Sequence, residues 1–198
     1  MIQVPYKNTA GKDYYAYWDN FLTDEDMNFL LHHPSWDAQQ DALVGQTNDG
    51  GSVNKDIRRT KVGWLNFDQQ NLHIWDKVSR IFAEVNSRFF HAHVTGCYEY
   101  MQLTAYYGQE NGKYDWHMDM CPKDVSIPRK LAMVLMLSDN SEYEGGEFQI
   151  KIGEKNEVLE TKKGRAWFMP SYILHRVTPI TKGVRKTAVV WAGGDQWK

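Results

Sequence analysis

The spacing of apolar residues predicts two helices in the first half of the chain. Between about Leu72 and Arg88, apolar side chains recur at steps of three and four residues, which places them on one face of a helix. This face comprises Leu72, Trp75, Val78, Phe82, Val85 and Phe89. A shorter helix is predicted from Thr23, whose hydroxyl can cap a first turn rich in acids, to about His33, where Pro34 ends it.

Two further N-terminal segments have distinct patterns. The aromatic run YYAYW at 14–18 is typical of a strand. The run GQTNDGGSVNKD at 45–56 is polar and rich in Gly and Asn, which predicts a mobile loop. We expect this loop to cover a bound substrate.

From Tyr98 onward the pattern changes to short strands separated by turns. The predicted strands are 98–107, 131–138, 146–152, 165–169, 173–178 and 184–192. The run LAMVLML at 131–137 is apolar on both faces, so it should be covered on each side. Gly145-Gly146 and Lys163-Gly164 provide turns between strands. Short strands packed beside helices predict a mainly β, jelly-roll sandwich.

Composition narrows the class of protein. The 198 residues suit one domain, and no repeat or linker divides them. A net charge of −2 argues against general nucleic-acid binding. The chain shows no secretory signal and no apolar run long enough to span a membrane. Cys97 and Cys121 form neither a disulfide framework nor a metal knuckle, so a cytoplasmic location is predicted.

A candidate metal site lies in the second half of the chain. His117 and Asp119, in YDWHMDM, point to one side if the segment is a strand. Because about one such His-x-acid pair is expected by chance, the pair needs support. His175, in PSYILHRV, can complete a triad of two histidines and a carboxylate, the set that binds Fe(II) and leaves positions open. We therefore predict that these three residues bind the metal and are catalytic.

Arg185 lies ten residues after His175 and is the predicted partner of a co-substrate carboxylate, because its guanidinium can bind a carboxylate through two hydrogen bonds. The intervening Thr181-Lys182-Gly183 reads as a turn. Arg185 would therefore return on a strand next to His175.

At this point the chain resembles a known family, the prolyl 4-hydroxylase-like branch of the Fe(II)/2-oxoglutarate-dependent dioxygenases. The resemblance runs in order from about Arg58 to Trp191. It passes through RRTKVGWL, a helix, YMQLTAYYGQENGKYDWHMD, LMLSDNSEYEGGEF and KKGRAWFMPSYILHRVTPITKGVR. It implies a double-stranded β-helix, a jelly roll with N-terminal and flanking helices. In domain terms it implies a single oxygenase domain over 1–198, with a mixed helical part to about 93 and the core at about 94–194.

The resemblance also implies roles for individual residues. His117, Asp119 and His175 match the iron ligands, and Arg185 matches the residue that binds the far carboxylate of 2-oxoglutarate. Tyr107 matches a tyrosine that contacts this co-substrate, with Tyr106 as the alternative if the register slips by one residue. Some members carry another tyrosine on the strand that matches LAMVLML, where this chain has Met133, Leu135 and Met136. Thr178 or Thr187 is the candidate for the missing hydroxyl.

The implied reaction couples decarboxylation of 2-oxoglutarate to hydroxylation of a C–H bond, with release of succinate and CO2. The implied cofactors are Fe(II), 2-oxoglutarate and O2, with ascorbate as a further expected addition. The expected substrate is a prolyl residue in a peptide or protein. A free amino acid, another small molecule or a nucleobase is the alternative, and a non-catalytic jelly-roll binding module is a rival class. The oligomeric state stays open.

Several other residues could have either a functional or a structural role. His91-x-His93 is the main competing metal pair, and we interpret it as solvated. Trp116 and Trp191 suit core packing, although Trp191 should lie near the metal pocket if the fold is right. Arg58 and Arg59 suit either a substrate entrance or a solvated loop.

Overall fold

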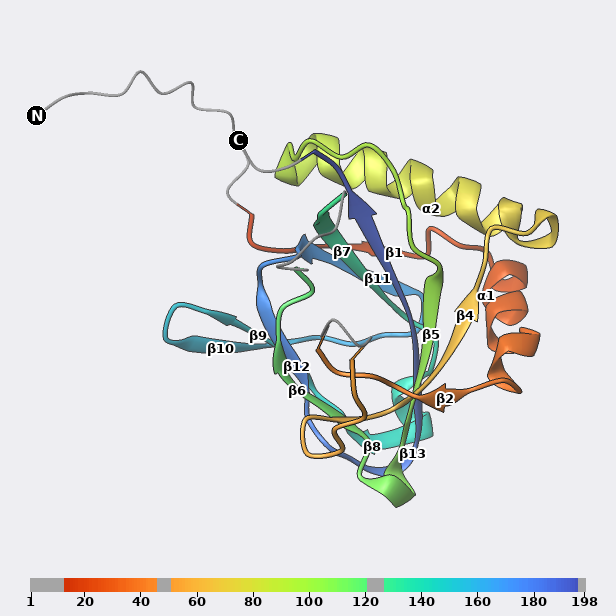
Figure 1. Ribbon diagram of the computed structural model, residues 1–198, viewed down its shortest axis with the longest axis vertical. Helices are drawn as coiled ribbons and strands as arrows, with labels where there is room; N and C mark the ends of the chain where they lie inside the picture. The colour runs from red at the N-terminus through yellow and green to blue at the C-terminus, as the bar shows by residue number, and fades with distance from the viewer. Residues whose placement is uncertain (1–12, 46–50, 121–126, 196–198) are drawn as a thin grey trace, which may run out of the picture.

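Two antiparallel sheets pack face to face (Figure 1) in a computed structural model that describes residues 13–45, 51–120 and 127–195. The eight-stranded sheet has the order β1-β11-β7-β13-β5-β4-β2, with β8 paired to β13. Its strands are β1 (Ala16–Asp19), β2 (Gln40–Asp41), β4 (Lys61–Leu65), β5 (Met101–Tyr107), β7 (Arg129–Met136), β8 (Tyr143–Gly145), β11 (Arg165–Pro170) and β13 (Ile180–Gly193). The five-stranded sheet has the order β10-β9-β12-β6-β3. Its strands are β3 (Arg58–Arg59), β6 (Lys113–His117), β9 (Phe148–Ile152), β10 (Lys155–Leu159) and β12 (Leu174–Val177). The mainly β, jelly-roll prediction is confirmed.

Helices cover the outer face of the larger sheet. They are α1 (Asp24–Leu31) and α2 (Leu72–Val85), and α2 continues into a π-helical turn, η3 (Asn86–Phe90). The short 3-10 helices are η1 (Pro34–Trp36), η2 (Gln69–Asn71), η4 (Gly108–Glu110) and η5 (Asn140–Glu142). Among the described residues, no helix is both long enough and apolar enough to cross a membrane.

The first helix is capped as its sequence predicts. The Thr23 hydroxyl accepts a hydrogen bond from the Asp26 amide, and the Asp26 carboxylate accepts one from the Thr23 amide. The helix ends at Leu31, two residues before the expected end, because His33 already has extended backbone and caps the next turn. The ammonium of Lys77 lies 2.6 Å from the Asp26 carboxylate and so ties α1 to α2.

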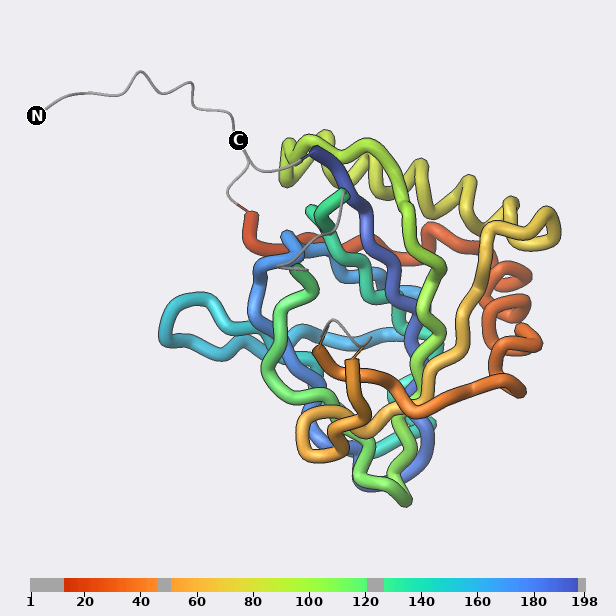
Figure 2. Tube along the Cα trace, viewed as in Figure 1, coloured from red at the N-terminus to blue at the C-terminus, as the bar shows by residue number. Residues whose placement is uncertain are grey.

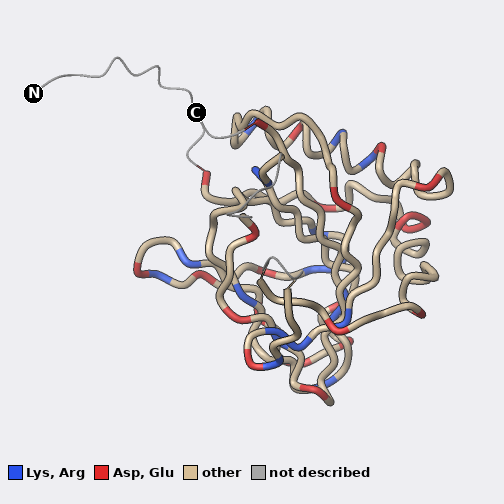
Figure 3. The backbone as a smooth tube through the Cα atoms, viewed as in Figure 1, with Lys and Arg blue, Asp and Glu red and all other residues tan. Residues whose placement is uncertain are grey.

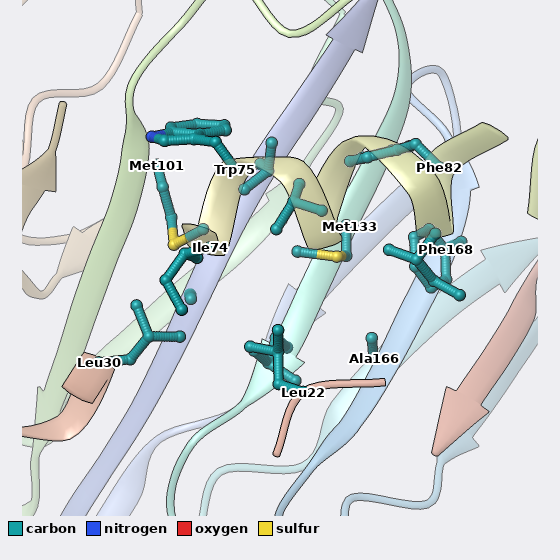
Figure 4. Packing of buried hydrophobic residues seen from close by; sticks show 14 of the residues in the cluster. Leu22, Leu30, Ile74, Trp75, Phe82, Met101, Met133, Ala166 and Phe168 are labelled. Carbon is teal, nitrogen blue, oxygen red and sulfur yellow. The ribbon is translucent and has the colours of Figure 1, made fainter. Parts of the chain in front are cut away.

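The second helix packs one apolar face onto the sheet (Figure 4). Its buried residues are Ile74, Trp75, Val78, Ile81, Phe82 and Val85. Phe82 meets Phe168 of β11 edge to face, with ring centroids 5.4 Å apart. Two residues of the predicted face differ. Leu72 is exposed, because the first residue of the helix lies to one side of this face, and Phe89 falls in the π-helical turn, where the spacing changes.

Strand β7 is buried on both faces, as its continuous apolar sequence predicts. Met133 and Leu135 join the core beneath the helices, while Val134 and Met136 join the core between the two sheets. This central strand therefore forms the wall that separates the helical layer from the space between the sheets.

The mixed N-terminal part contributes strands to both sheets. Strand β1 pairs with β11, β4 pairs with β5, and β3 pairs with β6. Strands β2, β3, β4, β6, β8 and β10 lie outside the segments predicted as strands. Strand β10 is largely polar because it forms the edge of its sheet and projects with β9 as a hairpin (Figure 2). Acidic and basic residues are interspersed along the chain (Figure 3).

The expected turn at 181–183 is wrong. Strand β13 runs through it from Ile180 to Gly193 and pairs with β8, β5 and β7. Gly183 has a φ of +69°, and a Cβ there would lie 1.9 Å from the carbonyl oxygen of Glu142, so only glycine fits this close approach. Arg185 therefore lies in the eight-stranded sheet and His175 in the five-stranded sheet, so the two residues are on opposite sheets of the sandwich rather than on neighbouring strands.

Candidate metal centre

A cavity of ≈710 Å³ opens between the two sheets and contains the predicted metal ligands. One wall is formed by side chains of the larger sheet, namely Gln102, Tyr106, Val134, Thr187, Val189 and Trp191. The opposite wall is formed by Tyr114, His117, Phe148, His175 and Val177 of the smaller sheet. Side chains of both sheets therefore line the cavity, and the polar residues lie among them.

The three predicted ligands converge in this cavity. His117 on β6 and His175 on β12 stand opposite each other in register, with ring centroids 4.1 Å apart. Asp119 follows β6, and its carboxylate oxygens lie 3.8 Å from the His117 Nε2 and 3.7 Å from the His175 Nε2. One ligand atom from each residue lies within 4.8 Å of the others. No second cluster of this kind occurs in the described parts of the chain.

Backbone carbonyls orient both histidine rings. The His117 Nδ1 lies 2.7 Å from the carbonyl oxygen of Asp115, and the His175 Nδ1 lies 2.9 Å from that of Ile173. With a proton on each Nδ1, each Nε2 presents its lone pair to the space beside Asp119. The Tyr114 ring also stacks on His117 at a centroid distance of 3.4 Å.

The protonation states suit metal binding. Burial and the neighbouring His175 ring lower the pKa of His117 to about 3, so the imidazole is neutral near neutral pH. Burial raises the pKa of Asp119, but the attraction of the two histidines, with smaller effects of Trp191 and Arg129, outweighs it and leaves the pKa lowered. A neutral imidazole and an ionised carboxylate are the forms that bind divalent metals.

Arg185 lies in the same region with its cationic head buried. The residue is 1% exposed, and its Nε and Nη1 atoms have no hydrogen-bond partner among the described residues. Its guanidinium lies 5.1 Å from the centroid of the Tyr106 ring, and its Nη2 donates to the sulfur of Met136 at 3.4 Å. Because an unpaired buried charge is costly, this arrangement favours an anionic ligand.

The structure favours Tyr106, the alternative considered from the sequence, over Tyr107 as the tyrosine next to the site. Tyr106 lines the cavity, whereas the hydroxyl of Tyr107 donates to the Gln39 side chain at 3.0 Å, outside it. Neighbouring strand residues point to opposite faces, so only one of the two can reach the site.

The structure also separates the two candidate threonines. Thr187 lines the cavity, and its hydroxyl has no partner among the described residues. The Thr178 hydroxyl instead accepts a hydrogen bond from the amide of Glu147, outside the cavity. Thr187 is therefore the one of the two that adds a polar group near Arg185.

The remaining residues considered from the sequence are placed as follows. Trp191 lines the cavity, whereas Trp116 lies beneath the Arg176 guanidinium at 4.5 Å and does not line it. His93 is exposed, with Asp195 as its ionic partner at 3.4 Å. Arg58 is buried at the cavity wall and lies over the Tyr114 ring at 4.4 Å. Residues 46–50 of the predicted loop, and Cys121, lie outside the described residues.

Sequence reasoning missed Tyr114 and Arg129. Simple alternation places Tyr114 and His117 on opposite faces of a strand. However, β6 has one more residue than β12 between their paired positions, and this bulge turns both side chains into the cavity. Arg129 lies over the Trp191 ring at 3.7 Å and binds Glu99, with an Nε–Oε1 distance of 2.5 Å. Nothing in the sequence around Arg129 indicated that it would lie at the cavity and contact Trp191 and Glu99.

The chemistry of the donor set fits a divalent iron. Two imidazoles and one carboxylate in a buried cavity, with other positions left for small ligands, match the set that non-haem Fe(II) prefers. In the same region, two guanidinium nitrogens of Arg185 and the hydroxyl of Thr187 have no partner among the described residues, and they are suitable donors to the carboxylate of an organic acid bound beside the metal.

Comparison with known proteins agrees with this geometry. Residues 101–193 match the family model of the 2OG-Fe(II) oxygenase superfamily. Over 87 residues the chain is 34% identical to a PKHD-type hydroxylase of Alteromonas mediterranea, which covers 41% of this chain and 38% of the relative. The chain therefore matches well under half of that relative's length.

Two solved structures share the fold. A prolyl-4-hydroxylase of Pseudomonas putida superposes with a TM-score of 0.72 at 14% identity, over 93% of this chain and 95% of that protein. A prolyl hydroxylase of Trichoplax adhaerens, in complex with a peptide fragment of the hypoxia inducible factor oxygen degradation domain, gives a TM-score of 0.72 at 19% identity. This second match covers 92% of this chain and 84% of that protein.

Proposed function

We propose that the chain is an Fe(II)- and 2-oxoglutarate-dependent dioxygenase that hydroxylates a prolyl residue of a peptide or protein, because residues 101–193 match the family model of the 2OG-Fe(II) oxygenase superfamily. The observation that carries this proposal is a buried His117–Asp119–His175 cluster in a cavity bordered by Tyr106, together with the buried guanidinium of Arg185 beside the Tyr106 ring, two of whose nitrogens have no hydrogen-bond partner among the described residues.

His117, Asp119 and His175 would hold the iron through one ligand atom each. When bound together, iron and 2-oxoglutarate supply the oxidising chemistry, in which O2 is consumed, succinate and CO2 are released and a C–H bond is hydroxylated. Three protein ligands leave further positions of the metal open to small molecules. The carbonyls of Asp115 and Ile173 keep the imidazole rings turned toward the metal position.

Arg185 would bind the far carboxylate of 2-oxoglutarate from the opposite sheet. The Thr187 hydroxyl would donate a further hydrogen bond to that carboxylate, and the ring of Tyr106 borders the same space. Gly146 has a φ of +67°, and a Cβ there would lie 1.9 Å from the Ile180 Cδ1 and 3.2 Å from the Arg185 Cδ, so glycine permits the close packing beside the arginine. Apolar neighbours such as Val134 and Val177 exclude water and strengthen the charge pairing.

The mouth of the cavity supports a peptide substrate. Leu43, Trp64 and Met118 line the cavity and are each about half exposed, which gives the cavity an apolar rim that a peptide could contact. The relatives add support, since the Alteromonas protein is described as a hydroxylase and the Trichoplax protein is a prolyl hydroxylase with a bound peptide. We expect the prolyl residue to enter through this rim.

Mass spectrometry of synthetic prolyl peptides tests the function. Incubation with the protein, Fe(II), 2-oxoglutarate, ascorbate and O2 should add one oxygen atom to a prolyl peptide and form an equivalent amount of succinate. A peptide with Ala in place of Pro, and the His175→Ala variant, are the matched controls. Succinate formed with a free amino acid or a nucleobase, but not with prolyl peptides, would move the assignment to a small-molecule substrate. A parallel reaction without ascorbate tests whether a reductant is needed.

A pair of tyrosine variants tests which of Tyr106 and Tyr107 contacts the co-substrate. Tyr106→Phe should raise the KM for 2-oxoglutarate about tenfold or more, because a hydrogen bond to a charged group contributes about 1.5–3 kcal/mol. Tyr107→Phe is the control, since its hydroxyl binds Gln39 outside the cavity. Steady-state kinetics at saturating Fe(II) measures both. A rise in KM for Tyr107→Phe alone would restore the original assignment.

A further inference from the structure

Asp119 differs from the two histidine ligands in how its backbone is held. His117 and His175 lie on paired strands, where the sheet ladder fixes them. Asp119 lies two residues beyond β6, and residues 118–120 belong to no helix or strand. Tertiary contacts must therefore fix this carboxylate.

Two hydrogen bonds bracket the Asp119 residue. On one side the Arg129 Nη1 donates to the carbonyl oxygen of Asp119 at 3.2 Å. On the other side the amide of Met120 donates to the carbonyl oxygen of Ser171 at 3.0 Å. The Ser171 hydroxyl donates to the carbonyl oxygen of Arg129 at 2.6 Å, so the two supports are joined to each other.

Arg129 is itself held rigidly. Glu99 accepts hydrogen bonds from its Nε and Nη2, which is the paired geometry that orients a guanidinium plane. The guanidinium lies 3.7 Å from the centroid of the buried Trp191 ring. Its Nη1 is therefore aimed at Asp119 by contacts with Glu99 and Trp191.

Ser171 links this support to the third ligand. It is 1% exposed and lies in the turn between β11 and β12, where the Ile173 amide donates to the Pro170 carbonyl oxygen. The carbonyl of Ile173 in turn orients the His175 ring. The same turn thus supports Asp119 through Met120 and His175 through Ile173.

We propose that Arg129 and Ser171 are positioning residues that hold Asp119 in place for the metal and so set the affinity of the site for divalent metal. This inference rests on the proposed metal centre. Neither residue donates a ligand atom. Both residues act on the Asp119 backbone. Their effect on metal affinity should therefore be measurable without a peptide substrate.

Anaerobic titration with Co(II), followed by its visible absorption and repeated with Fe(II), tests the inference in the absence of peptide and 2-oxoglutarate. Arg129→Met should raise the Kd for Co(II) about 10- to 100-fold, the usual effect of removing a residue that supports a metal ligand. Arg129→Lys should fall between this variant and the wild type. Ser171→Ala should shift the Kd in the same direction. In a separate assay with 2-oxoglutarate and peptide, saturating Fe(II) should restore the rate of succinate formation in these variants.

Arg165 offers a matched control. Its guanidinium is also bound by a carboxylate through two hydrogen bonds, to Asp19 at 2.7 and 2.9 Å, and lies 4.2 Å from the centroid of an aromatic ring, Tyr17. It does not line the metal cavity. Arg165→Met should therefore change the thermal stability without changing the Kd for Co(II) more than about twofold. If Arg129→Met fails to fold, Arg129→Lys and Ser171→Ala carry the test.

The outcomes separate the inference from its alternatives. Wild-type Co(II) affinity in Arg129→Met, together with a higher KM for peptide, would overturn the inference and make Arg129 a substrate contact. An equal loss of affinity in Arg165→Met would overturn it in favour of general destabilisation. A wild-type protein that binds Co(II) but hydroxylates no prolyl peptide would leave the inference standing and refute the proposed function. A wild-type protein that binds no Co(II) would refute both.

Discussion

Replacing Arg185 by Ala should raise the KM for 2-oxoglutarate by about a hundredfold to several thousandfold. The proposed partner is a carboxylate in a buried region, where removing one member of an ion pair costs about 3–5 kcal/mol, and each 1.4 kcal/mol is about a factor of ten in affinity. Arg185 is 1% exposed, so water cannot replace the lost guanidinium without entering the space between the sheets.

Two further substitutions at this position sharpen the test. Arg185→Lys should do less damage than Arg185→Ala, because it keeps the charge but loses the two parallel hydrogen bonds. Arg185→Glu should be inactive, because two carboxylates would then meet in a region of low dielectric. Steady-state kinetics with varied 2-oxoglutarate measures the first two variants.

Controls separate a co-substrate defect from misfolding. Anaerobic Fe(II) titration should give the wild-type affinity in each Arg185 variant, because the metal ligands lie on other segments. Arg176→Ala, on the outer side of β12 beside Trp116, should leave the KM for 2-oxoglutarate unchanged. An unchanged KM in Arg185→Ala would falsify the assignment, and loss of iron in the same variant would indicate a folding defect.

Replacing His117, Asp119 or His175 by Ala should reduce succinate formation to the background rate. A site with three protein ligands loses a third of its protein donors in each variant, and the two that remain cannot hold the metal against water. The fold should survive, because in each case the change removes a polar group from the wall of a cavity rather than from a packed core.

Metal-dependent thermal stability provides a second measurement. A metal that binds only the folded state raises its melting temperature, so Co(II) should stabilise the wild type and not the three ligand variants. His93→Ala is the control, because this exposed histidine pairs with Asp195 outside the cavity. Normal turnover in His175→Ala, combined with an inactive His93→Ala, would show that the metal binds elsewhere.

Local sequence patterns were sufficient to predict much of the fold. The apolar spacing of α2, the capping of α1 by Thr23 and the double-sided burial of β7 all follow from interactions within a few residues or from the simple count of apolar faces. The residue types of His117, Asp119, His175 and Arg185 likewise indicated the chemistry of the site, because the type of a side chain limits which ligands it can bind.

Only the tertiary structure decided which of two adjacent residues faces the site. Tyr106 and Tyr107 are equivalent in sequence pattern, and a shift of one residue in strand pairing exchanges their faces. The same holds for Tyr114, which reaches the cavity only because β6 bulges against β12. Register and bulges depend on the partner strand, which lies far away in the sequence.

Long-range contacts also decided where the charged groups meet. Arg185 lies in the sheet opposite His175, because β13 continues through the segment that the sequence suggested was a turn. Asp119 is held by Arg129 and by the turn at Ser171, neither of which belongs to its own strand. The sequence by itself determined which chemical groups this protein has, and the packing of the two sheets determined which of them converge, since convergence depends on contacts between distant segments.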